Sequence, residues 1–151
     1  SNKLIGRKIM SYGEEHRLLS DEQYGSRKDN SARDHATNKR IILDYTRQMK
    51  VNAIYITNDA KSCYDRILLF TAYTTMRKYG IPMEAAKSAI TALSKMVCRI
   101  RTSHGDSKQR YGGDMLDEYI HGVGQGNGYG PAIWAAISSI VFKIMNSFYF
   151  F

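Results

Sequence analysis

Two segments of the chain carry apolar residues at helical spacing. The clearer one begins at Met83 and continues to about residue 100, with lysine and arginine on its other faces. Its apolar positions are Ala86, Ala89, Ile90, Leu93, Met96, Val97 and Ile100. The second segment covers residues 31–49 and starts with Ser31, followed three residues later by Asp34, a pattern typical of a helix N-cap. We therefore predict one helix over each segment.

Local patterns predict further elements. A helix is expected over residues 66–79, closed by Gly80, and another from Pro131 towards the C-terminal end. Residues 51–57, VNAIYIT, are rich in β-formers and apolar on both faces, as a central strand covered on both sides would be. Residues 98–124 predict two short strands joined by a polar loop that contains glycine.

These elements predict an α+β (α/β-like) fold in which helices pack on a small sheet. One central strand and one hairpin do not make a complete sheet, so we expect the sheet to be incomplete. The segment 131–151 is nearly long enough to cross a bilayer, but Lys143, Asn146 and three serines favour a helix buried in protein. A membrane anchor remains the weaker alternative. The closing residues SFYFF predict poor solubility of the isolated chain.

Composition and charge narrow the class of protein. The chain has 151 residues, of which 43% are hydrophobic and 24% charged, as in a globular domain. Its formal net charge of +8 favours an anionic partner such as nucleic acid. Cys63 and Cys98 form neither a disulfide framework nor a familiar metal-ligand spacing, and no signal peptide is visible at the N-terminal end. We expect an intracellular protein of the cytoplasm or nucleus.

The stretch YITNDAKSCYDRI, residues 55–67, breaks an apolar run with Asn58 and Asp59 and adds a second carboxylate at Asp65. One interpretation is structural, with an Asx turn after the strand and Asp65 as the cap of the next helix. The other is functional, because Asp59 would stand at the carboxyl end of a buried strand, where α/β folds commonly place functional groups.

A glycine cluster, HGVGQGNGYGP, has glycine at every second position from Gly122 to Gly130. It does not fit the dinucleotide pattern G-x-G-x-x-G, and no Walker lysine is present. It is either a flexible loop before a helix or a loop whose backbone approaches a planar or phosphorylated ligand closely. Gln125 would then supply an amide that can donate and accept hydrogen bonds.

Four stretches together resemble signatures of reverse transcriptases. DAKSCYDRI resembles the palm signature D-L-K-x-A-F-D-x-V, and GVGQGNGYGP resembles G-V-P-Q-G-S-x-L-S-P. YGSRKDNSARDH is similar to G-F-R-x-G-R-S-x-x-D, and MRKYGIP to L-x-x-x-G-I-P. They occur in the expected order across about residues 22–142. The resemblance is to RNA-directed DNA polymerases of non-LTR retrotransposons and group II introns, and it implies a single partial reverse-transcriptase domain over residues 1–151, containing fingers and palm.

The resemblance implies two-metal nucleotidyl transfer with Mg²⁺. It makes Asp59 the catalytic, metal-binding aspartate and the backbone carbonyl of Ala60 a further metal ligand. The backbone amides near Ser62 and Cys63 would face the triphosphate of the incoming nucleotide. Tyr64 would stack under the incoming sugar and exclude a 2′-hydroxyl.

Other residues receive roles from the same resemblance. Gln125 and Gly126 match the pair that contacts the incoming nucleotide and its template base. Arg27 matches a family arginine, for which a structural ion pair and a nucleic-acid contact are both open. Lys61 is either solvated or functional, and Asp65 is interpreted chiefly as a helix cap. The implied partners are an RNA template, a DNA primer, deoxynucleoside triphosphates and the remainder of the polymerase chain, without a membrane.

The chain also departs from the family pattern. Gly124 replaces the usual proline and Asn127 the usual serine. No clear match to the basic fingers segment precedes residue 22, and the Y-x-D-D hairpin that supplies the other carboxylates should follow the terminal helix. We therefore expect the chain to be catalytically inactive by itself. The alternative is a non-catalytic nucleic-acid-binding relic of a decayed retroelement.

Overall fold

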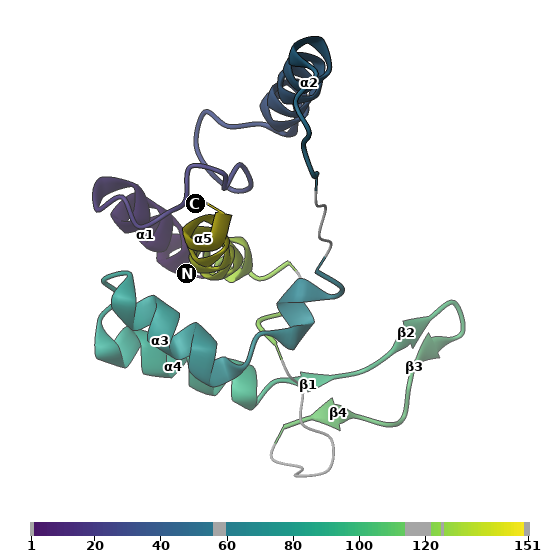
Figure 1. Ribbon diagram of the computed structural model, residues 1–151. Coiled ribbons are helices and arrows are strands. Elements are labelled where there is room, and N and C mark those ends of the chain that lie inside the picture. Colours follow the sequence, from purple (N-terminus) through teal and green to yellow (C-terminus); the bar gives the residue numbers. More distant parts are fainter. Residues whose placement is uncertain (1, 56–59, 114–121, 125, 150–151) are drawn as a thin grey trace.

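The computed structural model describes residues 2–55, 60–113, 122–124 and 126–149. Helices dominate, and the strands are short (Figure 1). The elements are α1 (Asn2–Glu15), α2 (Ala32–Met49), the 3₁₀ helix η1 (Cys63–Arg66), α3 (Leu69–Lys78), α4 (Met83–Ser94), β1 (Val97–Cys98), β2 (Arg101–Thr102), β3 (Gly105–Asp106), β4 (Tyr111–Gly112) and α5 (Gly130–Tyr149).

The hydrophobic core lies around the first half of α5. This helix contacts α1, α3 and η1, and α3 in turn packs on α4 (Figure 1). Ile133 and Ala136 of α5 have no exposed surface, and neither do Ile9 of α1 and Met76 of α3. Small residues such as Ala132 and Ala136 let neighbouring elements approach α5 closely. The helices therefore contact mainly one another.

The strands form two antiparallel pairs. β1 pairs with β4 and β2 with β3, so the segment from Val97 to Gly112 is one long hairpin with an interrupted ladder. The combination of helices with small antiparallel sheets confirms the coarse α+β prediction. The predicted second strand falls mostly on residues 114–121, outside the described residues.

The helix predicted from Met83 to about residue 100 ends earlier, at Ser94. Val97 and Cys98 instead pair with Gly112 and Tyr111, so they lie in a strand. The helical spacing of Val97 and Ile100 was therefore misleading. Cross-strand hydrogen bonds stabilise the extended backbone at these residues in place of a continued helix.

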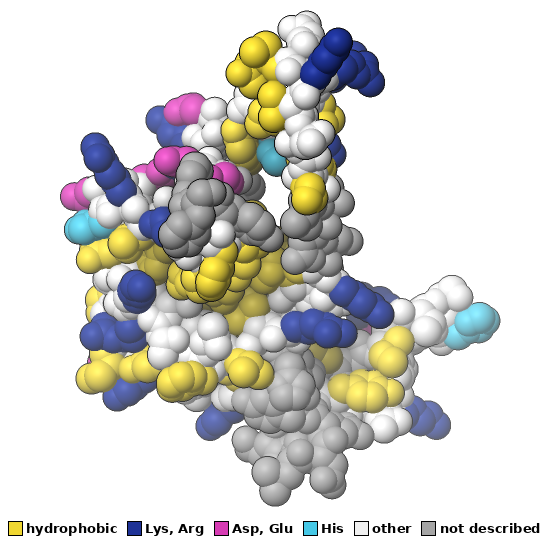
Figure 2. Space-filling model, in the orientation of Figure 1, with side chains coloured by type: hydrophobic (Ala, Val, Ile, Leu, Met, Phe, Trp, Pro, Cys, Tyr) yellow, Lys and Arg dark blue, Asp and Glu magenta, His cyan; other side chains and the backbone are white. Residues whose placement is uncertain are grey.

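The helix predicted over residues 31–49 is confirmed as α2. Ser31 is its N-cap, and Ser31 and Asp34 form a reciprocal capping box, with each side chain accepting from the other residue's N–H. None of the residues of α2, all of which the structure describes, is buried. The helix stands apart from the core, with hydrophobic side chains on its surface (Figures 1 and 2).

The prediction of a buried central strand is wrong for residues 51–55. These residues form no strand, and Ile54 is 91% exposed. A strand needs a neighbour to pair its backbone groups, and no described strand pairs with this segment. Residues 56 and 57 lie outside the described residues. The β-formers at residues 51–57 indicated an apolar segment. They could not show whether another strand lies beside it.

The terminal helix α5 begins at Gly130, one residue before the start predicted at Pro131. Its first half is buried, whereas Ile140, Val141, Ile144 and Phe148 in its second half are exposed. By length and composition alone, residues 130–148 could cross a membrane. The prediction of a buried helix therefore holds for the first half of α5.

Candidate functional site

The two segments that resemble palm signatures are in direct contact. The backbone N–H of Val123 donates to the carbonyl of Tyr64, with an N···O distance of 2.9 Å. Gly122 lies so close to the preceding segment that a Cβ there would be 2.5 Å from the Asp65 Cα. At the start of α5, a Cβ on Gly130 would be 3.5 Å from Cδ1 of the Tyr64 ring. Residues 60–66 and 122–130 therefore belong to one site.

The first segment turns sharply before η1. Ser62 adopts a left-handed conformation, with φ 51° and ψ 45°, and the N–H of Asp65 donates to its carbonyl at 3.0 Å. This turn places Ser62 on the surface and the amides of Ser62 and Cys63 at the start of a helical turn. N–H groups at such a start lack intrahelical acceptors.

The prediction that Asp65 caps the following helix is wrong. Asp65 lies inside η1, and α3 begins four residues later, at Leu69. Its N-cap is Leu68, which makes no side-chain capping hydrogen bond. The backbone of Asp65 instead provides the surface against which Gly122 packs. The residue therefore serves the contact between the two segments through its main chain.

Tyr64 is the side chain that fixes this contact to the core. It is partly buried and packs against the hydrophobic core. Burial is the main cause that raises the pKa of its phenol, and the nearby Cys63 adds to the effect. The Tyr64 ring is therefore neutral at physiological pH. It offers a rigid, uncharged surface at the centre of the site.

The glycine cluster of residues 122–130, called the glycine loop from here on, is buried at both ends, and its described middle residues are less buried. Val123 and Tyr129 are buried, with 0% and 1% exposure, and burial raises the pKa of the Tyr129 phenol against the opposing effect of a hydrogen bond with Asn127. Between them, Gly124 and Gly126 have positive φ and nothing within 4 Å of a built Cβ. The backbone there has the free space that close approach of a ligand requires.

Two cavities meet beside Cys63 and share Ala60, Cys63 and Trp134 in their walls. One, of about 350 Å³, has the aromatic side chains of Tyr24, His35, Trp134 and Phe142 around it. The other, of about 480 Å³, has the cationic side chains of Lys61 and Arg66. An aromatic wall suits a nucleobase and a basic wall suits phosphates, so the pair of cavities could hold a nucleotide.

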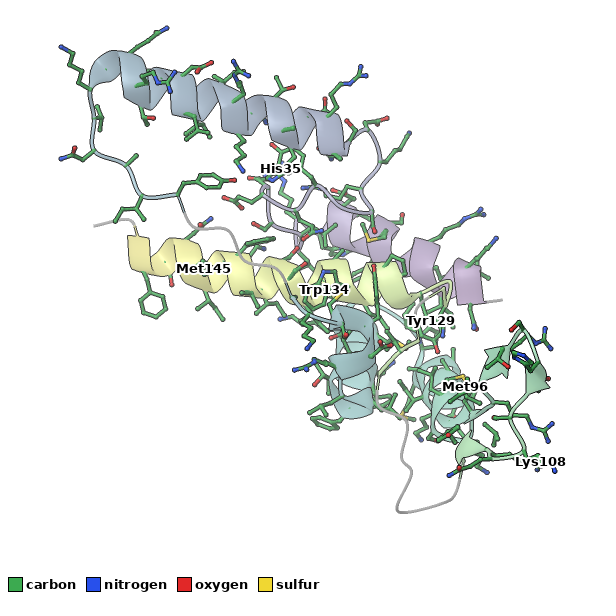
Figure 3. The ribbon with its side chains drawn as sticks, turned by 90° about the vertical axis from the view of Figure 1, so that its right-hand side faces the viewer. His35, Met96, Lys108, Tyr129, Trp134 and Met145 are labelled. Carbon is green, nitrogen blue, oxygen red and sulfur yellow. The ribbon has the colours of Figure 1, made fainter. Side chains whose placement is uncertain are left out.

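The aromatic wall was missed by sequence reasoning. Trp134 belongs to α5 and His35 to α2, and Figure 3 shows His35 on the side of α2 that faces α5. The ring of His35 lies 5.0 Å from that of Tyr24, in a tilted arrangement. The chain has a single tryptophan, three residues after Pro131, which was the available signal. Nothing in the sequence pattern connects it with residues 24 and 35.

The predicted site residues fare differently in the structure. Ala60 and Cys63 line both cavities, Lys61 is exposed in the wall of the second, and Gly126 lies in the exposed middle of the loop. Asp59 and Gln125 lie outside the described residues. The structure therefore brings together the backbone and aromatic parts of the predicted site.

Arg27 has a structural role. Its guanidinium donates two hydrogen bonds of 2.8 Å to the Glu14 carboxylate and one of 2.9 Å to the Ser20 carbonyl. The Glu14 hydrogen bond is the main cause that raises the Arg27 pKa, and only 16% of the side chain is exposed. Of the two interpretations of this arginine, the ion pair is therefore the one observed.

The described residues do not by themselves supply a magnesium site. Among them, no group of three or more histidine, cysteine, aspartate or glutamate side chains could hold a metal ion. Asp59 lies outside this part of the chain. A two-metal centre would need carboxylates in addition to those that the structure describes.

The chain matches no protein-family model, no curated protein and no solved structure. The case for its function therefore rests on its residues and their geometry.

Proposed function

We propose that this chain is part of an RNA-directed DNA polymerase of a retroelement. The observation that supports the proposal is the contact between residues 60–66 and 122–130, made by the Val123–Tyr64 hydrogen bond and the packing of Gly122 on Asp65. In reverse transcriptases both signatures act on the same incoming nucleotide, so they must be neighbours. The resemblance was found from the order of residues alone and did not depend on this contact. The contact therefore supports the proposal independently of the resemblance.

In this proposal the site receives a deoxynucleoside triphosphate opposite an RNA template. The ring of Tyr64 lies under the sugar and leaves no room for a 2′-hydroxyl. Gln125 and Gly126 contact the nucleotide and its template base, while the amides of Ser62 and Cys63 bind the triphosphate. The open space around Gly126 supports a close approach of the ligand to the loop backbone.

The cofactor in this proposal is Mg²⁺, which would bind at Asp59 and the Ala60 carbonyl and would supply activation of the primer hydroxyl and charge stabilisation at the leaving pyrophosphate. Its remaining carboxylates would come from the rest of the polymerase chain. The other partners are the RNA template and the DNA primer, in the cytoplasm or nucleus and without a membrane. The isolated chain is expected to show no template-directed DNA synthesis.

The first test is to read the coding frame for about 60 codons after Phe151. An aromatic-x-Asp-Asp sequence there would supply the missing carboxylates of a two-metal site. A stop codon without that sequence would overturn the polymerase proposal. It would favour the second candidate, a nucleic-acid-binding relic, which the net charge of +8 supports equally well.

The second test uses the protein encoded by the whole reading frame, in primer extension on an RNA template with Mg²⁺. Asp59→Asn should lower the extension rate roughly a hundredfold or more, because it removes a charge that acts on the transition state. Asp44→Asn is the matched control, since Asp44 is exposed on α2 and pairs with Arg40 of the same helix. Equal rates for the two variants would contradict the proposal.

A third test addresses the role of Tyr64 in sugar selection. Tyr64→Ala should raise the incorporation of ribonucleotides relative to deoxyribonucleotides, because it removes the ring that excludes the 2′-hydroxyl. Tyr73→Ala is the control, since Tyr73 is also partly buried against the core but lies on α3. An unchanged ratio for Tyr64→Ala in an active enzyme would remove this residue from the nucleotide site.

A further inference from the structure

A third cavity lies on the other side of the glycine loop. It has a volume of about 490 Å³ and lies where α1, the loop before α2 and the start of α5 meet. Figure 1 shows the N-terminal end of α1 beside α5. Its walls are formed by Lys3, Gly6, Arg7, Met10, Ser26, Lys28, Gly128, Pro131 and Ala132. The residues that α1 contributes to it, Lys3, Gly6, Arg7 and Met10, belong to none of the sequence motifs.

The charges around this cavity are all positive. Lys3, Arg7 and Lys28 are exposed at its rim, and none of the described residues that line it is acidic. Within the part of the chain that the structure describes, none of these three side chains takes part in an ion pair or hydrogen bond. Three cations around one cavity, with no ion-pair partner among the described residues, favour an anionic ligand.

The neighbouring cavity at the end of α1 differs in this respect. Its wall contains Arg17, Arg27 and Lys143 together with the carboxylates of Glu14, Asp21 and Glu22. Arg27 pairs with Glu14, and the ammonium of Lys143 donates to the carbonyls of Arg17 and Leu18. Acidic residues in the same wall therefore offset the positive charge there. The cations around the third cavity are available for a ligand.

At this cavity the backbone of α1 packs closely on the glycine loop. A Cβ on Gly6 would lie 2.4 Å from the Gly128 carbonyl oxygen, and one on Gly128 would lie 2.7 Å from the Lys3 backbone nitrogen. The N-terminal part of α1 thus packs on the loop at Gly128, while Val123 near the other end of the loop contacts Tyr64. Neither α1 nor α5 has an acidic residue in its first turn to offset the charge.

We propose that this cavity binds a backbone phosphate of the nucleic-acid strand that passes the glycine loop. Lys3, Arg7 and Lys28 would neutralise the phosphate, and the apolar surface of Met10, Pro131 and Ala132 would face the sugar. The identity of the ligand as nucleic acid rests on the proposed function. The site itself goes beyond the residues that the palm signatures contain, because Lys3 and Arg7 lie outside all of them.

The test is binding of a fluorescein-labelled 20-nucleotide single-stranded RNA, followed by anisotropy at several salt concentrations. The variant carries Lys3→Gln, Arg7→Gln and Lys28→Gln. The control carries Lys78→Gln, Lys87→Gln and Lys95→Gln, which remove the same charge from exposed positions on α3, on α4 and at the C-cap of α4. Circular dichroism and thermal melting of each variant establish that it is folded.

The cavity variant should reduce the slope of log affinity against log salt by about 2, because each lost contact with single-stranded nucleic acid removes about 0.7. At 0.1 M salt this corresponds to about a hundredfold weaker binding. The control should leave the slope nearly unchanged. Lys28→Gln alone, in a loop where folding is least affected, should reduce the slope by about 0.7.

Two outcomes would overturn the inference. Equal losses in the cavity and control variants would mean that only net charge matters. A wild-type chain that binds no RNA would also exclude the phosphate site. Neither result bears on the primer-extension tests of Asp59 and Tyr64, so failure of this site can be told apart from failure of the proposed polymerase function.

Discussion

At the scale of single residues, the glycines of the loop are not equivalent. Gly122 has φ 94° and would place a Cβ 2.5 Å from the Tyr64 carbonyl oxygen, whereas Gly126 has φ 88° and open space around it. The two positions share the backbone strain that a side chain would introduce but differ in steric contact. Substitutions at Gly122 and Gly126 therefore distinguish backbone strain from steric overlap within one loop.

Gly122→Ala should lower the free energy of unfolding by about 3 kcal/mol, because it combines positive-φ strain with overpacking against the Tyr64–Asp65 backbone. Gly126→Ala should cost only about 1 kcal/mol, from strain alone. Urea unfolding of both variants measures the difference. Equal destabilisation would show that the contact between the two segments is not maintained in solution.

The sequence singled out the glycine cluster but could not rank its members. Glycine occupies every second position there, so nothing in the pattern distinguishes the contact at Gly122 from the open backbone at Gly126. Likewise, Arg27 could be matched to a motif, yet its ion pair with Glu14 depends on a fold that brings α1 beside it. Contacts between distant residues are invisible to local patterns.

At the scale of elements, helices with their own stop and start signals were predictable. The capping box at Ser31 and Asp34 located α2, and Gly80, with φ 76°, closes α3 as predicted. The strand predicted at residues 51–57 would form only beside a neighbouring strand. The prediction that Asp65 is a helix cap would hold only if α3 began directly after it. The predictions failed at residues whose structure depends on contacts with a neighbouring element.

The isolation of α2 leads to a prediction about hydrogen exchange. Because none of its residues is buried, α2 should open locally at a much lower free energy than the first half of α5. Ser31→Ala removes the cap and should weaken α2 by about 1 kcal/mol. Amide exchange should therefore accelerate in α2 alone. Faster exchange in α5 to the same extent would mean that the two helices unfold together.

The loop between α1 and α2 is held by α5 through polar contacts. The Glu22 carboxylate accepts hydrogen bonds from Ser20 and, at 2.7 Å, from the Asn146 amide of α5. The Ser20 hydrogen bond is the main cause that lowers the Glu22 pKa below 4.5, and burial opposes it. The charged carboxylate is therefore preferred in the folded protein.

This preference predicts an acid-sensitive contribution to stability. A lowered folded-state pKa stabilises the protein above the unfolded value of 4.5 and loses that effect as the pH falls through the folded value. Glu22→Gln should make the free energy of unfolding depend less on pH below about pH 5. Unfolding by urea at several acidic pH values measures it. An unchanged pH dependence would assign the acid sensitivity to other carboxylates.

At the scale of the whole molecule, α2 and the second half of α5 are two of the segments that expose apolar surface. α2 exposes Ile41, Ile42 and Tyr45, and the second half of α5 exposes Ile144 and Phe148. Figure 2 shows hydrophobic side chains on the surface of α2. Patches of this kind promote association. The poor solubility expected from the closing residues thus has a second source in α2, none of whose residues is buried.

We predict that the isolated chain self-associates and that Ile144→Glu together with Phe148→Glu reduces this. Both residues are exposed, so the substitutions remove apolar surface without disturbing the core. Leu4→Glu, at an exposed position on α1, is the control and should have a smaller effect. Sedimentation velocity measures the distribution of species. A wild-type chain that remains monomeric at all concentrations would contradict the prediction.

The hydrogen bond between Val123 and Tyr64 joins parts of the chain that are about 60 residues apart. Closing so long a loop costs conformational entropy, and prior formation of the α3–α4 pair shortens the flexible chain that must be closed. The site should therefore assemble late in folding. During synthesis, a nascent chain whose glycine loop is still inside the ribosome can have α3 and α4 but has no site for a nucleotide.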